Sequence, residues 1–130
     1  MRIAVAGGTG TIGSEVVAAV GERGDEVVVL SRSNGVDVQT GEGLVAALDG
    51  VDALVDAVNA TTLSAAGATE FFTTTSRTLL AAEREAGVAH HVLLSIVGVD
   101  RAPFGYYAGK LAQEREVEAG DVPWTILRAT

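Results

Sequence analysis

The fold of this chain is decided by its first residues, Arg2-Ile3-Ala4-Val5-Ala6-Gly7-Gly8-Thr9-Gly10-Thr11-Ile12-Gly13. The short apolar run at the start predicts a buried strand, and the residues from Ile12 to Val20 repeat apolar side chains at helical spacing. Three glycines between them, Gly8, Gly10 and Gly13, match the pattern G-x-G-x-x-G. Glycines at this spacing allow a tight turn, let a pyrophosphate approach the backbone, and let the helix pack closely on the strand.

Residues 7–13 are therefore expected to cradle the diphosphate of a dinucleotide. The helix that follows the glycines presents free backbone N–H groups and the positive end of its dipole to the turn, and both favour an anion. The alternative is an ordinary glycine-rich connection between a strand and a helix, without a ligand.

Composition narrows the class of protein. The chain has 130 residues, no cysteine and a formal net charge of −8, which predicts a single domain, residues 1–130, in a reducing cytoplasmic compartment. An acidic chain without a basic stripe is expected to have no nucleic-acid partner. No apolar run approaches the roughly 20 residues that span a bilayer, so no membrane partner is expected either. His90 and His91 point to opposite faces of a strand, and no metal site is predicted.

Glycines and aspartates divide the remainder into alternating strand-like and helix-like segments. The further predicted strands are Glu26–Leu30, Val36–Val38, Asp52–Val58, His91–Ile96 and Trp124–Arg128. The further predicted helices are Gly43–Leu48, Ala68–Ala86 and Tyr106–Ala119, with loops at 31–35, 61–67 and 98–105. Apolar strands that alternate with helices predict a parallel sheet covered on both faces. The expected fold is α/β, a doubly wound Rossmann fold of about six strands in the order 3-2-1-4-5-6.

Ligands of such sheets bind beyond the carboxyl ends of the strands. A domain that selects NAD(H) usually has an acidic residue at the end of the second strand, whereas this chain has Ser31, Arg32 and Ser33. A guanidinium and two hydroxyls can hold the 2′-phosphate that a carboxylate would repel. The sequence therefore predicts a preference for NADP(H), with NAD(H) as the alternative, and a solvated surface arginine as the simpler explanation.

Two further strand ends carry candidate cofactor contacts. Asp37 could accept a hydrogen bond from the adenine amino group, with Val38 against the ring, or could simply form a turn. Asn59 and Ala60 could border the ribose, or Asn59 could close its strand by an Asx turn.

A tyrosine and a lysine stand four residues apart near the end of the chain. Tyr106 and Lys110 share one face of the predicted helix. An ammonium group beside a phenol favours the phenolate and lowers its pKa from about 10. Tyr106 could thus transfer a proton to a carbonyl oxygen that Ser95 orients, while Lys110 holds the nicotinamide ribose. The alternative is an exposed Tyr–Lys pair and a strand-end serine.

With these residues placed, the sequence resembles the short-chain dehydrogenase/reductase superfamily, in its atypical NmrA-like NAD(P)H-binding branch. The resemblance is carried by Gly7–Gly13, Gly50–Ala53, Gly87-Val88, Leu94–Asp100, Tyr106–Glu114 and Pro123–Arg128. It implies a Rossmann fold, NADP(H) on the glycine loop, and Ser95, Tyr106 and Lys110 at the Ser-Tyr-Lys positions of the superfamily. Relatives continue beyond the last strand into residues that build the substrate pocket, and this C-terminal part is expected to be absent here.

The resemblance implies an oxidoreductase that reduces a small quinone or carbonyl substrate with NADP(H). A non-catalytic module that senses NADP(H) for a protein partner, and a cofactor-binding fragment inactive on its own, are the alternatives. Superfamily members often pair through the helices beside the fifth strand, so a homodimer through Phe71, Phe72, Tyr107 and Leu111 is compatible with the sequence. The same residues would serve equally well as core.

Overall fold

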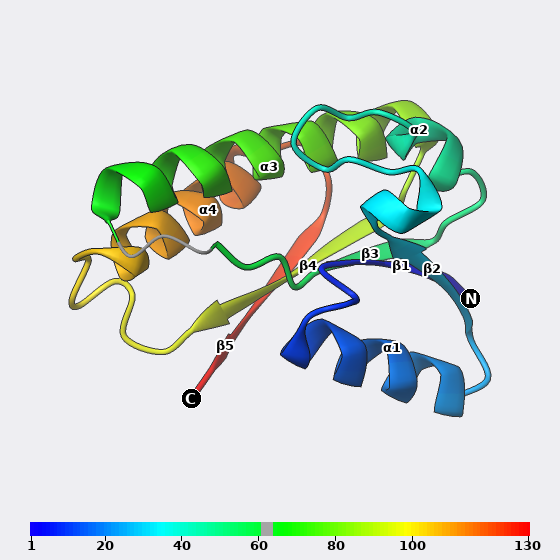
Figure 1. The fold of residues 1–130 in the computed structure, drawn as a ribbon, viewed down its shortest axis with the longest axis horizontal. Coiled ribbons are helices and arrows are strands. Elements are labelled where there is room, and N and C mark those ends of the chain that lie inside the picture. The colour runs from blue at the N-terminus through cyan, green and yellow to red at the C-terminus, as the bar shows by residue number, and fades with distance from the viewer. Residues whose placement is uncertain (61–63) are drawn as a thin grey trace.

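The computed structural model describes residues 1–60 and 64–130, and Figure 1 shows their arrangement. The described strands are β1 (Arg2–Ala6), β2 (Glu26–Leu30), β3 (Ala53–Asp56), β4 (His90–Ile96) and β5 (Trp124–Ala129). The helices are α1 (Thr11–Glu22), α2 (Leu44–Ala47), α3 (Ala65–Ala86) and α4 (Tyr106–Ala119), with a 3₁₀ turn, η1, at Arg32–Asn34. The strands form one parallel sheet in the order β2-β1-β3-β4-β5.

Helices cover both faces of this sheet, as expected of a Rossmann fold. α1 packs on β1 and β2 from one side, while α3 and α4 lie together across the other side (Figure 1). On the α1 side, β4 and β5 have no covering helix in the described part of the chain, and Leu127 is 56% exposed. Among the described helices, none is both long enough and apolar enough to cross a membrane.

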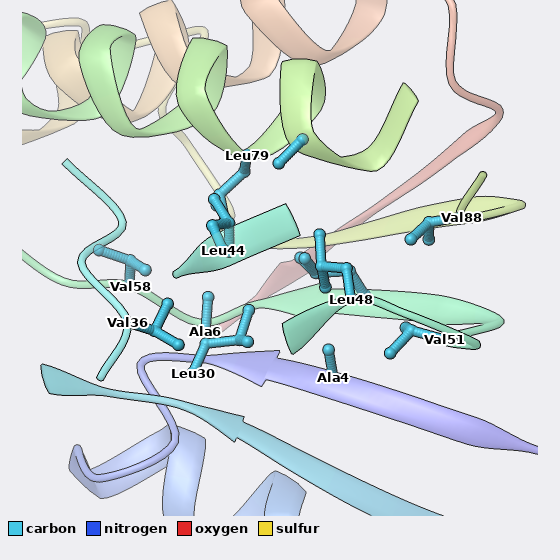
Figure 2. Close-up of a cluster of buried hydrophobic side chains, with 12 residues drawn as sticks. Ala4, Ala6, Leu30, Val36, Leu44, Leu48, Val51, Val58, Leu79 and Val88 are labelled. Carbon is cyan, nitrogen blue, oxygen red and sulfur yellow. The ribbon is translucent and has the colours of Figure 1, made fainter. Parts of the chain in front are cut away.

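The main apolar core lies between the sheet and the layer formed by α2 and α3 (Figure 2). Ala4 and Ala6 of β1 present small side chains, above which Leu44 and Leu48 are fully buried. Leu79 of α3 closes the cluster from above. Small residues on β1, an interior strand of the sheet, thus let the helical layer approach the sheet closely.

The predicted strand Val36–Val38 is wrong, so the described sheet has five strands rather than about six. Without it, the order of the other strands is the predicted one. Backbone bonds turn this segment back on itself: the Asp37 N–H donates to Glu42 O (3.0 Å), and its carbonyl accepts from Gly41 N (2.8 Å). The apolar residue that suggested a strand, Val36, is buried in the core as part of a loop.

The long helix α3 begins earlier than predicted, at Ala65 instead of Ala68. The Ser64 hydroxyl accepts a hydrogen bond from Gly67 N at 3.1 Å, which makes Ser64 the N-cap. The predicted loop 61–67 therefore ends at Ser64, and its residues 61–63 lie outside the described part.

The glycine turn between β1 and α1 is a close backbone contact. A Cβ atom at Gly13 would lie 1.8 Å from the carbonyl oxygen of Gly7, and one at Gly7 would lie 2.5 Å from the carbonyl oxygen of Ala57. Gly7 also has a φ of +78°, which L side chains rarely adopt. Helix, strand and the segment after β3 therefore meet at a point that has no room for side chains.

Gly13→Ala is expected to destabilise the fold, because the new methyl group forces the helix away from β1. Overpacking of this kind costs about 1–3 kcal/mol or more. Gly21, in the last turn of the same helix, has open space around it. Gly21→Ala is therefore the matched control, and we expect it to be neutral or stabilising by up to about 1 kcal/mol. Urea unfolding measures both; equal stability of the two variants would contradict the close contact.

Candidate functional site

A cleft of about 510 Å³ opens at the carboxyl ends of β1, β2 and β3. Its size is within the usual range for small-molecule sites, about 300–1,000 Å³. Of the residues that the sequence assigned to the cofactor, it is lined by Gly7, Thr9, Gly10, Ser31, Arg32, Asp37, Val38, Asn59 and Ala60. The assigned residues outside the lining are Gly8, Thr11, Ile12, Gly13, Ser33 and Lys110. The sequence pattern thus places most of its candidates around one cavity.

The glycine loop brings the start of α1 to this cleft. Gly10 is the N-cap of the helix, and its N–H donates to Gly7 O at 3.0 Å. No side chain caps this end in the described structure, and the first turn contains no acidic residue. Gly8 has a packing role, because a Cβ there would lie 3.1–3.2 Å from Val29 and Val17. The free N–H groups and the dipole of α1 thus favour an anion beside Gly7 and Gly10.

The end of β2 brings hydroxyl groups and a guanidinium to the cleft. Ser31 and Ser33 are hydrogen-bonded to each other through their hydroxyls at 3.0 Å, across η1. Arg32 is exposed, and no carboxylate of residues 1–60 or 64–130 forms an ion pair with it. Its charge therefore remains available to a ligand.

Asp37 is the acidic residue among the described lining residues of the cleft. Its Oδ1 accepts hydrogen bonds from the backbone N–H groups of Gln39 (2.8 Å) and Thr40 (3.3 Å). The turn-forming alternative for Asp37 is therefore present in the structure, although Asp37 and Val38 both border the cavity.

Asn59 connects the cleft to helix α4. Its Oδ1 accepts the backbone N–H of Ala60 at 3.0 Å, and it also accepts the hydroxyl proton of Tyr106. Tyr106 itself is the first residue of α4 and is half-buried. The residue predicted as a proton donor thus touches a residue of the cleft lining without being part of that lining.

Tyr106 and Lys110 share one face of α4, as their spacing predicts, and both contact Phe72. The Tyr106 ring meets the Phe72 ring edge to face at 5.5 Å, and the Lys110 ammonium lies 4.9 Å from the Phe72 ring centre. Burial raises the pKa of Tyr106, which is the opposite of the direction expected from a neighbouring ammonium. The phenol is therefore neutral in this arrangement.

The Lys110 ammonium is buried rather than exposed to the cleft. It donates a hydrogen bond to Leu94 O at 2.9 Å, and the residue is 3% exposed. Burial lowers the pKa of Lys110, while the negative charges of Asp56 and Glu114 oppose that effect. To reach a ribose in the cleft, this side chain would have to exchange its bond to Leu94.

Ser95 is at the end of β4 and is 4% exposed, outside the cleft lining. It is close to Glu114 of α4, whose pKa burial alone would raise. The hydrogen bonds and the charge of Arg128 outweigh burial and hold that pKa below its usual value. The bonds of Arg128 to the two carboxylate oxygens are 2.6 and 3.0 Å long. The Ser95 hydroxyl lies buried beside this contact between α4 and β5, and among the described residues it has no hydrogen-bond partner.

Fold and cleft together define a dinucleotide-binding α/β protein, because glycines that tolerate no Cβ meet the start of a helix at the carboxyl end of β1. The chain belongs to the NAD(P)H-binding family, whose model matches residues 7–130. Among curated proteins, none matches the sequence significantly.

Solved structures share the fold. One is a short-chain dehydrogenase/reductase superfamily protein from Agrobacterium tumefaciens with bound NAD, with 25% identity and a TM-score of 0.77 over 98% of this chain and 48% of that one. Another is the Thermus thermophilus UDP-glucose 4-epimerase with NAD, with 26% identity and a TM-score of 0.76 over 98% of this chain and 54% of that one. A third is the NADPH-dependent quinone oxidoreductase of Escherichia coli with NADPH, with 20% identity and a TM-score of 0.75 over 97% of this chain and 48% of that one. The chain thus spans about half of these proteins, and the resemblance drawn from the sequence is confirmed.

The sequence analysis missed a group of buried polar residues behind the site. Asp56 is fully buried at the end of β3, where its carboxylate accepts from Val58 N (3.1 Å) and from Gln113 Nε2 (3.3 Å). It fixes the segment that leads to Asn59. A charged residue at the end of an otherwise apolar strand was the available signal.

Glu83 and His91 form a second buried pair, between α3 and β4. His91 Nδ1 lies 2.5 Å from Glu83 Oε1, and both side chains are completely buried. Burial alone would lower the pKa of His91, but the hydrogen bond and charge of Glu83, together with the charge of Asp56, raise it. Burial raises the pKa of Glu83, although His91 opposes this. The pair therefore holds its proton more tightly than the unfolded chain does.

The sign of this shift predicts how stability depends on pH. The contribution of His91 is complete below its unfolded pKa of about 6.5 and is lost as the pH rises through its higher folded pKa. Relative to the double variant Glu83→Gln/His91→Asn, the wild type should therefore lose stability as the pH rises above about 6.5. Urea midpoints of both proteins across this range test the prediction; parallel curves would contradict it.

Proposed function

We propose that this chain binds NADP(H) in the cleft at the ends of β1, β2 and β3. The observation that carries this proposal is the combination of the glycine cradle with Arg32, whose guanidinium is on the cleft and has no ion pair in the described structure. The start of α1 would hold the diphosphate, and Arg32 with Ser31 and Ser33 would hold the 2′-phosphate. Asp37 and Val38 would border the adenine, and Asn59 and Ala60 the ribose.

We propose further that the protein reduces a small quinone or carbonyl compound. When bound, the nicotinamide supplies the reducing equivalent. In this proposal Tyr106 would give its hydroxyl proton to a carbonyl oxygen, Ser95 would orient that oxygen, and Lys110 would bind the ribose once it leaves Leu94 O. A quinone needs less help from Tyr106. One neighbour in fold, the NADPH-dependent quinone oxidoreductase, shows that this fold accommodates such chemistry.

A sensing role is the second candidate, and one observation favours it. Ser95, Tyr106 and Lys110 all lie outside the lining of the cleft, so cofactor binding does not by itself bring them to the ligand. A sensing module would bind NADP⁺ and NADPH with different affinities and would pass this difference to a protein partner without turnover.

Self-association through α3 and α4 stays a prediction. Phe72 is fully buried within the chain and has no surface to offer a second copy, whereas Tyr107 and Leu111 are half-buried on α4. Gel filtration at the dimer mass would support the pairing.

Arg32→Ala is expected to weaken NADPH binding about 10- to 100-fold, since a charged hydrogen-bond partner contributes about 1.5–3 kcal/mol. NADH binding should change little, because NADH lacks the 2′-phosphate. Arg84→Ala removes the same charge from the exposed side of α3 and is the matched control. Calorimetric titrations with both cofactors measure these affinities. Equal losses for NADPH and NADH would reject the role of Arg32, and no binding by the folded wild type would reject the proposal for this chain.

Tyr106→Phe is expected to lower kcat for a carbonyl substrate by about 10²- to 10⁴-fold if the hydroxyl supplies the proton. The effect on a quinone should be smaller. Tyr107→Phe removes the neighbouring hydroxyl and serves as the control. Rates of NADPH oxidation with a panel of quinones and aldehydes measure the difference, and unchanged turnover of every active substrate would remove Tyr106 from the mechanism.

A further inference from the structure

The hydroxyl of Tyr106 joins two parts of the molecule that are 47 residues apart in the sequence. Its partner, Asn59, belongs to the cleft lining, whereas Tyr106 begins α4. This bond is thus a direct polar connection between the proposed cofactor site and the proposed proton donor.

Both ends of the bond are held in place. On the cleft side, Asn59 Oδ1 also accepts the N–H of Ala60 at 3.0 Å, which requires the oxygen rather than the NH₂ of the amide at this position. The preceding turn is fixed in the same way, by the bond from Val58 N to the buried carboxylate of Asp56. On the helix side, the edge-to-face contact with Phe72 fixes the Tyr106 ring.

We infer that Asn59 is the positioning residue of Tyr106 and selects its protonated form. An amide oxygen can only accept a hydrogen bond, so the phenol must donate, and a phenolate at this place would face the lone pairs of the amide oxygen. This inference rests on the proposed function for its consequence, namely that Tyr106 is kept ready as a proton donor.

The surroundings of Tyr106 support the same direction. α3 presents the uncharged ring of Phe72, and burial of the phenol also favours the neutral form. The charged groups of this region are Lys110, on the same face of α4, and Asp56 at the end of β3, whose charge acts on Lys110. The charges of Lys110 and Asp56 are opposite in sign, so their effects on the pKa of Tyr106 oppose each other. The uncharged hydrogen-bond acceptor Asn59 is therefore the group to remove in the test.

The test uses the background Tyr107→Phe, in which Tyr106 is the remaining tyrosine of the two. Ultraviolet absorbance of tyrosinate then reports the titration of Tyr106 in the unliganded protein. Asn59→Ala should lower the pKa of Tyr106, because the hydrogen bond that favours the protonated form is lost, and Asn59→Asp, whose acceptor carries a charge, should raise it. Asn34→Ala, which deletes the same amide at a site bonded to Val29 O, should leave it unchanged.

A second readout covers the case in which high pH unfolds the chain before Tyr106 titrates. The Cζ carbon of a tyrosine labelled with carbon-13 responds to the hydrogen bond of its hydroxyl, and it can be followed by NMR at neutral pH. Asn59→Ala should move this resonance and Asn34→Ala should not. A purely structural role for Asn59 would not give opposite pKa shifts in the Ala and Asp variants.

The outcomes separate this inference from the proposed function. A Tyr106 pKa and Cζ shift that ignore every change at Asn59 would overturn the positioning role, even if NADPH binds tightly. Opposite shifts in the two Asn59 variants together with no NADPH binding would support the positioning role and reject the proposed function. In an active protein, Asn59→Ala should also move the pH at which kcat declines to a lower value, in step with the pKa.

Discussion

The contact between the carbonyl group of Gly7 and the backbone of Gly13 is the constraint on which the rest of this structure depends. Because neither glycine carries a Cβ, the first turn of α1 can lie directly against the end of β1, and this approach leaves no room for a side chain. The same point receives the backbone after β3 at Ala57, so three segments converge without side chains. The N–H groups of α1 and the cleft are direct consequences of this convergence.

A second close approach builds the other half of the molecule. A Cβ at Gly109 would lie 2.6 Å from the Cβ of Ala68, so α3 and α4 touch at this level. Gly109 precedes Lys110, and the contact brings the ammonium over Phe72 and down to Leu94 O. The residues between Tyr106 and Lys110 therefore matter for packing, because Gly109 among them lets α4 lie close to α3.

How far the sequence predicts this structure depends on which interactions each residue makes. Local patterns were sufficient for the glycine turn, for the order of the described strands and for most of the cleft, because these follow from apolar periodicity and from glycine spacing. They failed at Val36–Val38, where two valines suggested a strand. The bonds of Asp37 to Glu42, Gln39 and Gly41 form a turn instead, and Val36 enters the core from a loop.

The buried polar residues could not be predicted, for a different reason. Glu83 occupies a helix rich in exposed charges, and only its partner His91, on a neighbouring layer, makes its burial tolerable. Lys110 is likewise a buried charged residue whose partners lie on other elements. Its spacing from Tyr106 was visible in the sequence, but its burial depends on Phe72, Leu94, Asp56 and Glu114, which belong to other elements. Pair interactions between layers leave no periodic signal in the chain.

These constraints together divide the site into two differently built parts. The cleft consists mostly of backbone and small side chains at the ends of β1, β2 and β3, and its form depends on Gly7 and Gly13, where a Cβ would clash with the backbone. Ser95, Tyr106 and Lys110 belong to β4 and α4, where side-chain packing and buried charge decide their positions. Asn59 belongs to the first part and is bonded to the second. A ligand that displaces or reorients the Asn59 amide would therefore act on Tyr106 directly, and the occupancy of the cleft and the protonation of the phenol would then be coupled through one side chain.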